Sequence, residues 1–417
     1  MKRDKRVITT IAEKPAYGGL AVARTESGKI ILVKGALPGE KVLAEIQDDH
    51  RDYFMATAVE ILDHSTERVT PECPHYGVCG GCQMQHASYR EQVRMKEDIL
   101  TEAVARSLGQ NIKLTHTFSS IEHWGYRLRG QFKTSKDSIG FFREKSDAVV
   151  NISCCPIMSA SVNNLLSKIR SVLDPAVNEI HISSASGSTA LVRLRSEIKN
   201  HDAPQKIASE LMHSGLTGVT IETKKGYLQF GNPHIQLDLC GYKYYASSLS
   251  FFQNNWQLNN IIVKFIADYI HSCPAGNIVD LYSGAGNLAL PAANYAKNIV
   301  CVEENPHAVQ DGIKNAQANA LLNCEFINLS AEKFEIPAAT DILILDPPRP
   351  GLTNRTMGNV LQASPARIIY MSCNPSTFAR DLKKLTQHYR LSQLSMIDFF
   401  PQTYHVETVV LMSRVDK

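Results

Sequence analysis

The sequence predicts an α/β protein whose C-terminal region folds as a Rossmann-like domain. Three short apolar runs there, residues 277–281, 341–345 and 368–372, each end abruptly in a polar or glycine-rich turn. Such runs indicate buried strands, and open α/β sheets bind their ligands at the carboxyl ends of such strands. The residues that follow these three runs are therefore the first candidates for a functional site.

Length and composition are compatible with a multidomain globular protein. The chain has 417 residues, of which 44% are hydrophobic and 20% charged, which suits two or three domains. The net charge of +3 is compatible with a polyanionic partner on a local basic face. No apolar run approaches a membrane span of about 18 residues, and the charged residues 1–6 lack a following signal-peptide core. We expect a cytoplasmic protein without membrane contact, and a monomer.

The N-terminal residues 1–63 are expected to form a small β-barrel. Short β-like runs such as 29–33 and 41–46 are separated by turn signals, among them Gly18-Gly19. The segment from residue 19 to residue 42 resembles the TRAM domain, an OB-like RNA-binding barrel found on RNA-modifying enzymes. A generic barrel without a ligand is the alternative.

Three clustered cysteines follow, Cys73, Cys79 and Cys82. Glycines between them let the backbone turn tightly enough for three thiols to surround one centre. The spacing C-x5-C-x2-C lacks the second cysteine pair that is usual in structural zinc sites. Three clustered thiolates with one distant cysteine commonly hold a 4Fe–4S cluster. We expect Cys155 as the fourth ligand, with Cys154 as its competitor and zinc as the alternative metal.

The next stretch predicts a helix and then a basic, aromatic strip. Apolar residues recur at helical spacing from residue 88 to residue 108. Residues 124–133 alternate cations with aromatic or apolar side chains, and residues 139–145 could pair with them as a hairpin. Cations for phosphates beside rings for bases suit single-stranded RNA, although an amphipathic sheet with a basic solvated face is the alternative. The cations expected to hold the RNA backbone are Arg127, Arg129 and Lys133.

The glycine-rich turn at 280–287 indicates a nucleotide-like ligand. It lies between a predicted strand and a predicted helix, and Glu303 ends the next strand about twenty residues later, where an acidic side chain suits a ribose diol. The third glycine of the G-x-G-x-x-G phosphate fingerprint is absent. S-adenosylmethionine has no pyrophosphate, so this departure favours a methyl donor over a nicotinamide cofactor.

The turn Asp346-Pro347-Pro348-Arg349 narrows the chemistry further. Methyltransferases that act on exocyclic amines often carry an aromatic residue at its fourth position, where this chain has Arg349. A cysteine, Cys373, instead follows the strand at 368–372. The sequence therefore favours a methylation that uses a cysteine nucleophile over methylation of an amine.

Several motifs together resemble a known family. They are the TRAM-like start, C-x5-C-x2-C with Cys155, Phe252-Gln253-Asn254-Asn255, residues 280–287, Asp346-Pro347-Pro348-Arg349, Ser372-Cys373-Asn374-Pro375 and residues 400–407. The chain is similar to the RNA 5-methyluridine (uracil-C5) methyltransferases, and within them to the iron–sulfur members with a TRAM domain that act on 23S rRNA. The resemblance spans almost the whole chain.

The resemblance implies three domains. Residues 1–63 would be the TRAM-like barrel, residues 64–245 a central α+β iron–sulfur and RNA-binding domain, and residues 246–417 the S-adenosylmethionine-dependent catalytic domain. The helix at 88–108 is expected to pack on the catalytic domain.

The resemblance also implies a mechanism and its residues. A thiolate on Cys373 would add to carbon 6 of uracil, provided that its surroundings lower the thiol pKa, and Glu407 would remove the proton from carbon 5. A solvated glutamate at the start of the last strand is the alternative for Glu407. The residues expected to contact the methyl donor are Gln253, Tyr282, Asn287, Glu303 and Asp346. Ser330 stands where the family often has Asp or Asn, so no donor contact is assigned there.

The substrate expected from the resemblance is ribosomal RNA, with the T-loop uridine of transfer RNA as the alternative. A non-catalytic RNA-binding iron–sulfur protein is the rival from another class, but it would not require Cys373, Glu407 and a donor pocket together. Radical enzymes that use S-adenosylmethionine usually show C-x3-C-x2-C, which this spacing does not match.

Overall fold

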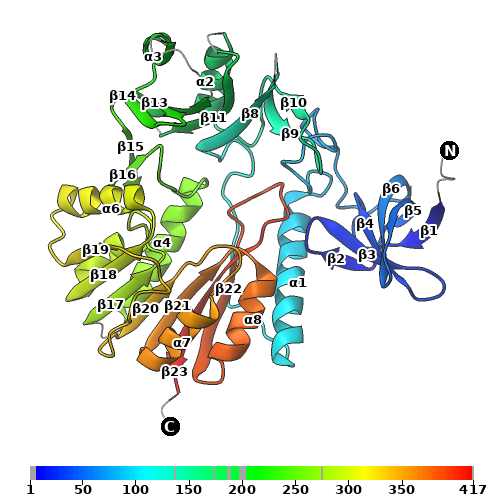
Figure 1. Ribbon diagram of the computed structural model, residues 1–417. Coiled ribbons are helices and arrows are strands. Elements are labelled where there is room, and N and C mark those ends of the chain that lie inside the picture. Colours follow the sequence, from blue (N-terminus) through cyan, green and yellow to red (C-terminus); the bar gives the residue numbers. More distant parts are fainter. Residues whose placement is uncertain are drawn as a thin grey trace.

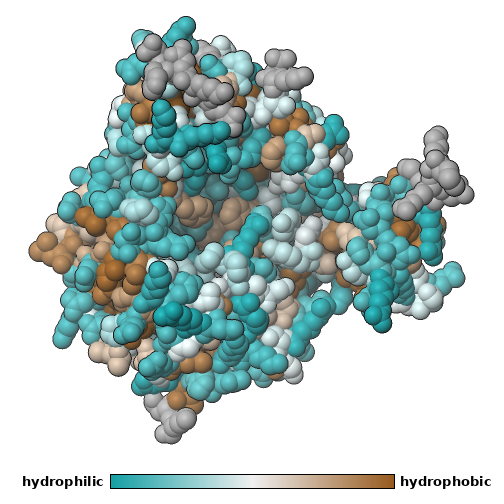
Figure 2. Space-filling model, in the orientation of Figure 1, coloured by the Kyte–Doolittle hydropathy of each residue, from teal (hydrophilic) through white to brown (hydrophobic). Residues whose placement is uncertain are grey.

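The computed structural model describes residues 6–135, 138–171, 174–185, 189–196, 203–273 and 276–415. The charged start at residues 1–5 lies outside the described residues. Figure 1 shows three bodies: an N-terminal sheet, a central sheet with two helices, and a large sheet covered by helices. Figure 2 shows that the surface is hollowed between the central and the large sheet, with hydrophobic side chains on its floor. No helix among the described residues is long and apolar enough to cross a membrane.

The N-terminal body is a six-stranded sheet in the order β1-β5-β6-β4-β3-β2. Its strands are β1 (Val7–Ile11), β2 (Lys14–Ala16), β3 (Leu20–Arg24), β4 (Ile30–Lys34), β5 (Lys41–Asp49) and β6 (Tyr53–Asp63). The alternation of small and branched apolar residues buries one face, around Ile31, Val33 and Val42. The pairing leaves β1 and β2 at the two ends of the sheet, so the structure does not show the expected closed barrel.

The central body is a seven-stranded sheet in the order β10-β9-β8-β11-β12-β13-β14. Its elements are β8 (Arg129–Ser135), β9 (Ser138–Phe142), β10 (Val149–Asn151), α2 (Ala160–Arg170), β11 (Val177–Ser184), β12 (Ala190–Ser196), α3 (Ala203–His213), β13 (Gly218–Thr223) and β14 (Gly226–Gly231). The antiparallel pairing of β8 with β9 confirms the predicted hairpin. A separate hairpin, β15 (His234–Leu239) and β16 (Tyr242–Ser247), follows this sheet.

The large sheet has eight strands in the order β19-β18-β17-β20-β21-β23-β22-β7. Its strands are β7 (His116–Phe118), β17 (Asn277–Leu281), β18 (Asn298–Glu303), β19 (Cys324–Asn328), β20 (Ile342–Leu345), β21 (Arg367–Ser372), β22 (Tyr389–Ile397) and β23 (Glu407–Arg414). Strands β17 to β21 pair in parallel, whereas β23 runs antiparallel to both β21 and β22. This pattern confirms the Rossmann-like α/β fold.

Helices cover both faces of this sheet because its strands are apolar on both sides. Its helices are α1 (Tyr89–Leu108), α4 (Trp256–His271), α5 (Ala289–Ala292) with the 3-10 turn η1 (Ala293–Tyr295), α6 (Pro306–Ala318), α7 (Asn354–Ala363) and α8 (Pro375–Leu385). Ile278, Ile342 and Ile369 pack toward α4 and α5. Their neighbours Val279 and Leu343 point the other way, toward α1, α7 and α8 (Figure 1).

Helix α1 confirms the predicted helix, and it packs on the large sheet. The Ser88 hydroxyl accepts a hydrogen bond from the Glu91 amide at its start, and Gly109, with a φ of 70°, ends it. Ile99 and Leu100 pack on the same core as α8. Although α1 and β7 precede the central sheet in sequence, both belong to the large sheet in space (Figure 1).

A buried ion pair ties α1 to the end of the chain. Lys96 Nζ lies 2.6 Å from Asp398 Oδ1 and donates a further hydrogen bond of 3.0 Å to the carbonyl of Phe400. Neither charged side chain is exposed to solvent. Burial lowers the pKa of Lys96, and the Asp398 carboxylate opposes that shift. Removing one partner would leave the other as an uncompensated charge in the interior.

We predict that Lys96→Met destabilises the protein by about 3–5 kcal/mol in urea unfolding, because Asp398 is left buried and unpaired. The double variant Lys96→Met/Asp398→Leu should recover most of this loss. The matched control Lys264→Met removes a surface partner of Asp268 and should leave stability nearly unchanged, because exposed ion pairs contribute little. Equal losses for the two lysine variants would contradict the assignment.

Candidate active site

The pairing of β21 with β23 brings Cys373 and Glu407 together. Ser372 lies opposite Thr408 in this antiparallel ladder. The residue after Ser372 and the residue before Thr408 are next in this antiparallel register, so Cys373 lies opposite Glu407. Strand β20 ends at the same edge of the sheet. The two residues that sequence reasoning assigned to catalysis, 34 positions apart, are neighbours in space.

The surroundings of Cys373 do not meet the expected condition of a lowered thiol pKa. Burial, together with the carboxylates of Glu407 and Asp346, raises the pKa of Cys373 to about 12. The nearby Arg349 guanidinium acts in the opposite direction but is the smaller effect. The thiol is therefore held protonated in the protein without ligands, and the condition attached to Cys373 as the nucleophile is not met in this state.

The carboxyl groups around Cys373 are shifted in the same direction. Burial raises the pKa of Asp346 to about 6. Burial also raises the pKa of Glu407 well above its usual value, and Asp346 adds to this shift, while Arg349 and Lys96 oppose it. Three acidic groups in one pocket make a site that favours an incoming positive charge.

Arg349 connects the two loops that line this pocket. Its guanidinium lies 3.3 Å from Nε2 of His405, on the segment that leads into β23. Burial lowers the pKa of His405 to about 4, and the cations Arg349, Arg127 and Lys96 lower it further. His405 is therefore neutral, and the positive charge at this edge comes from arginine.

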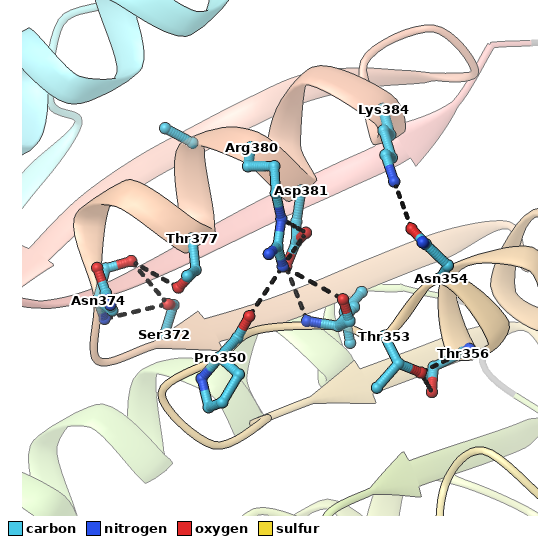
Figure 3. A network of polar contacts seen from close by, with 12 residues as sticks. Pro350, Thr353, Asn354, Thr356, Ser372, Asn374, Thr377, Arg380, Asp381 and Lys384 are labelled. Atoms are coloured by element: carbon cyan, nitrogen blue, oxygen red, sulfur yellow. Dashed lines mark hydrogen bonds and ion pairs between the residues drawn. The ribbon is translucent and has the colours of Figure 1, made fainter.

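Helix α8 holds the loop around Pro350, which follows the Asp346–Arg349 turn (Figure 3). Thr377 Oγ1 donates to the carbonyl of Arg349 at 3.0 Å, and the Arg380 guanidinium donates to the carbonyl of Pro350 at 2.9 Å. Gly351, with a φ of 75°, lies so close to Asp381 that a Cβ would come within 2.5 Å of its carboxylate. The loop that follows Asp346 is thus packed directly onto the helix that follows Cys373.

The N-terminal body reaches this pocket through Tyr17, which sequence reasoning did not find. The Tyr17 ring packs edge-on against Tyr404, with ring centroids 5.2 Å apart. Burial raises the pKa of Tyr17 to about 12, with Tyr404 adding to the shift. Cys373 and Glu407 also contribute to it, which places the tyrosine within electrostatic range of both.

The second half of the site is the glycine-rich turn after β17. Glu303 Oε2 accepts a hydrogen bond of 3.0 Å from the Gly284 amide, and Oε1 accepts one of 2.8 Å from Asn305. Each carboxylate oxygen keeps a free lone-pair direction, which suits a ribose diol. Tyr282 holds a φ of 64°, a conformation that non-glycine residues rarely adopt outside functional sites.

Asp280 and Ser283 carry buried polar atoms with no protein partner. Both carboxylate oxygens of Asp280 and the Ser283 hydroxyl lack a hydrogen bond within the described residues. Burial raises the pKa of Asp280 well above its usual value, and Asp346 and Glu303 add to this shift. Such atoms fit a polar ligand, because a buried group without any partner costs about 1–3 kcal/mol. Sequence reasoning placed Asp280 in the motif but gave it no role.

Asn287 and Gln253 complete the predicted donor set. Asn287 exchanges two amide hydrogen bonds, of 2.8 and 2.9 Å, with the buried Asn259 on α4. Asn259 was not predicted, because a lone asparagine within an amphipathic helix gives no signal. Gln253 is partly buried and lies two residues before Asn255, whose side chain caps α4. Asn287 is thus tied to α4 at the end of the glycine-rich turn.

The clustered cysteines line a cavity of about 130 Å³ at the base of the central body. Its lining includes Cys73, Cys79, Cys82, Cys154 and Cys155. No group of three or more His, Cys, Asp or Glu side chains in the described ranges is arranged to hold a single metal ion. The two cysteine segments therefore converge on one cavity, but not with the spacing of a mononuclear site.

The thiols around this cavity influence one another. Burial raises the pKa of Cys155 to about 12, and Cys82 and Cys73 contribute to the shift. Burial raises the pKa of Cys82 to about 11, with Cys79 and Cys73 also contributing. Cys155 is buried, whereas Cys154 is exposed. Four thiolates this close repel each other unless a cationic centre lies between them.

The cations of the basic strip, which were expected to hold the RNA backbone, contact other parts of the protein. The guanidinium of Arg127 lies 5.5 Å from the ring centre of Phe400. Arg129 donates to the carbonyl of Ser250 at 3.3 Å and stacks near Phe251. Lys133 pairs with the Glu179 carboxylate. Arg127 and Arg129 thus contact residues outside the central sheet, whereas Lys133 is paired within that sheet.

Comparison with known proteins agrees with this architecture. A family model described as tRNA (Uracil-5-)-methyltransferase matches residues 88–415, and a TRAM domain model matches residues 6–59. An uncharacterized RNA methyltransferase of Aquifex aeolicus is 34% identical and covers 99% of this chain and 100% of its own length. The 23S rRNA (uracil(1939)-C(5))-methyltransferase RlmD of Erwinia tasmaniensis is 32% identical and covers 93% of this chain and 92% of its own length.

A solved structure shares the fold over nearly the whole chain. It is the Pyrococcus abyssi tRNA (uracil-54, C5)-methyltransferase in complex with S-adenosyl-L-homocysteine, with a TM-score of 0.78 and 23% identity. It covers 97% of this chain and 100% of its own. With the family model spanning the catalytic sheet and both of its candidate residues, the chain belongs to the S-adenosylmethionine-dependent RNA uracil-C5 methyltransferase family.

Proposed function

We propose that the protein methylates carbon 5 of one uridine in 23S rRNA through a covalent bond between Cys373 and carbon 6 of the base. The observation that carries this proposal is the placement of Cys373 opposite Glu407, beside the Asp346–Arg349 turn. RNA uracil-C5 methylation is the activity of the family. The covalent route and the residue roles are our assignment.

The thiol of Cys373 first loses its proton to solvent. The thiolate Sγ then forms a bond to carbon 6, and the electron pair of the C5–C6 double bond moves toward the carbonyl at carbon 4 as an enolate. Carbon 5 then takes the methyl group, the carbon–sulfur bond of the sulfonium breaks, and neutral S-adenosylhomocysteine leaves. Glu407 accepts the proton of carbon 5, the double bond forms again, and the thiolate is released. Atoms and charges balance over the cycle.

Electrostatics favour this order of events. The methyl donor is a sulfonium cation, and binding it beside Asp346 offsets the negative charge that raises the pKa of Cys373. The thiol therefore becomes more acidic when the donor is in place. The raised pKa of Glu407 makes its carboxylate a stronger base for the later proton transfer.

For donor binding we propose Gln253, Tyr282, Asn287, Glu303 and Asp346, and we add Asp280. The unpartnered carboxylate of Asp280 and the half-used carboxylate of Glu303 support this set. For the substrate, the RlmD relative of Erwinia tasmaniensis supports ribosomal RNA over transfer RNA. We propose three domains, residues 1–63, 64–245 and 246–417. Helix α1 and strand β7 lie within the second range in sequence but pack with the large sheet.

We further propose that the cysteine cavity holds a 4Fe–4S cluster on Cys73, Cys79, Cys82 and Cys155. Their convergence on one cavity supports a polynuclear centre, as does the C-x5-C-x2-C spacing with one distant cysteine. The burial of Cys155 favours it over the exposed Cys154. When bound, the cluster supplies a cross-link between the two cysteine segments.

Cys373 can be tested with RNA that contains 5-fluorouridine. Fluorine cannot leave carbon 5 as a cation, so the wild-type protein should form a covalent complex that survives denaturing electrophoresis. Cys373→Ala should form none, whereas the matched control Cys240→Ala should behave as wild type. Ribosomal and transfer RNA fragments compared in this assay identify the substrate. A Cys373→Ala protein that still forms the adduct would falsify the nucleophile assignment.

Glu407 can be tested with ordinary uridine RNA. Glu407→Gln should methylate the base but release it slowly, so that a methylated covalent complex accumulates and turnover falls by on the order of 10²–10⁴-fold. The control Glu335→Gln alters an exposed carboxylate and should leave turnover unchanged. Unimpaired release by Glu407→Gln would assign the proton transfer to another group.

The pH dependence follows from the raised pKa of Glu407. Only the deprotonated carboxylate can accept the carbon-5 proton, so turnover at saturating substrates should fall as the pH is lowered through that raised pKa. The protonated thiol of Cys373 acts in the same sense, because attack requires the thiolate. Initial rates of methyl incorporation, measured between about pH 5 and pH 9, should show this fall in turnover at low pH.

The metal assignment can be tested by anaerobic purification. The wild-type protein and Cys154→Ser should contain iron and acid-labile sulfide, whereas Cys155→Ser should lose most of both. Iron loss in Cys154→Ser with retention in Cys155→Ser would exchange the two ligands. Zinc without sulfide in the wild-type protein would overturn the cluster.

A further inference from the structure

Gln402 has an unusual backbone and full hydrogen bonding. It is buried, with 2% of its surface exposed, and its φ of 70° lies in the left-handed region that non-glycine residues rarely adopt. Such a conformation costs on the order of 1–3 kcal/mol and persists only where the surroundings impose it. The motif 400–407 contains Gln402, but neither the covalent step nor donor binding uses it.

The cysteine loop and helix α1 impose this conformation from two sides. The carbonyl of Gln402 accepts hydrogen bonds from the amides of Gln83 at 3.1 Å and Met84 at 3.0 Å, directly after Cys82. From α1, Gln92 Nε2 donates to Gln402 Oε1 at 2.9 Å, and Gln92 Oε1 accepts from the Gln402 amide at 2.8 Å. Gln402 therefore joins the cysteine loop, α1 and the segment before β23.

This junction lies on the short path from the cysteine cavity to Glu407. After Gln402, the Thr403 hydroxyl donates a hydrogen bond of 2.9 Å to the carbonyl of Phe400, and His405 contacts Arg349. Glu407 then begins β23, where it faces Cys373. A shift of the Gln402 carbonyl would therefore move the start of β23 relative to β21, and displacements of about 1 Å at a reacting group can cost on the order of 10²-fold in rate.

A second contact runs parallel to the first. Arg127 lines the cysteine cavity and also stacks on Phe400, while the Tyr126 hydroxyl donates to the carbonyl of Pro401 at 3.0 Å. The segment 400–402 is thus held by residues next to the cavity on both of its sides. A shift of the residues that line the cavity would therefore also move the segment 400–402.

We propose that Gln402 is a positioning residue through which the cysteine loop holds Glu407 in place for proton removal from carbon 5. The inference rests on the proposed function, since it assigns a step to Glu407. It adds that the four-cysteine site acts on the catalytic centre by ordering residues 400–407. The contact is made by Gln83 and Met84, the two residues that follow Cys82.

The kinetic test separates adduct formation from proton removal. Gln402→Ala should trap 5-fluorouridine RNA as wild type does, because adduct formation does not require proton removal by Glu407. With ordinary uridine RNA its methylated covalent complex should persist, and kcat should fall on the order of 10²-fold with the KM values for RNA and donor within about twofold. Gln92→Ala removes the same side-chain contacts from α1 and should show the same pattern if Gln402→Ala folds poorly. The exposed Gln387→Ala is the matched control.

The structural test uses amide hydrogen exchange and needs no turnover. In Cys155→Ser the amides of Gln83, Met84 and Gln402 should exchange at least tenfold faster than in wild type. The Leu352 amide, which donates to Asp381 at 2.8 Å, should not change and serves as the internal control.

Two results would overturn the inference. One is a Gln402→Ala protein that slows adduct formation and proton removal equally; the other is unchanged exchange in Cys155→Ser after its iron is lost. If instead the wild-type protein formed no adduct with 5-fluorouridine RNA, the proposed function would fail first. The two failures are therefore distinguishable.

Discussion

The antiparallel pairing of β21 with β23 is the constraint on which the site depends. A parallel neighbour would bring another strand end to this edge but could not place the start of β23 against the end of β21. Because β23 runs backward, the first residue of one strand meets the residue just past the other. The hydrogen bonds of the ladder thereby fix the separation of thiol and carboxylate without help from flexible loops. Helix α8 and the Asp346–Arg349 turn add the remaining walls, and both are held by the polar network around Asp381.

The charge distribution around this edge suits a cationic ligand. Cys373, Glu407 and Asp346 all have raised pKa values, mainly because each is buried. Arg349 is near enough to oppose the shift at two of them, yet it does not reverse either. A pocket of this kind disfavours its own ionisation until a positive charge arrives. Under the proposed mechanism, binding of the methyl donor would therefore make the thiol reactive.

Much of the catalytic sheet could be predicted, because its strands are short apolar runs that end in marked turns. The same signal located Cys373, Asp346 and Glu303 at the edge where they lie. Tertiary partners could not be predicted. Lys96 and Gln402 look like ordinary surface residues of a helix and a loop, and only packing reveals that both are buried. The raised thiol pKa could not be predicted, since burial and neighbouring carboxylates depend on segments distant in sequence. The partners of the basic strip within the protein could not be predicted either, because alternation alone does not tell which face another part of the chain covers.

The position of β7 has a consequence for how the chain folds. This strand, residues 116–118, closes the edge of the large sheet beside β22, residues 389–397, so the central body is an insertion between parts of one folding unit. During synthesis α1 and β7 emerge long before their partners α8 and β22, so they cannot pack until residues up to 397 have been made. Contacts of such high sequence separation slow folding. A fragment that starts at residue 246 would also expose the apolar surface that α1 covers, so it is a poor choice for expression as an isolated catalytic unit.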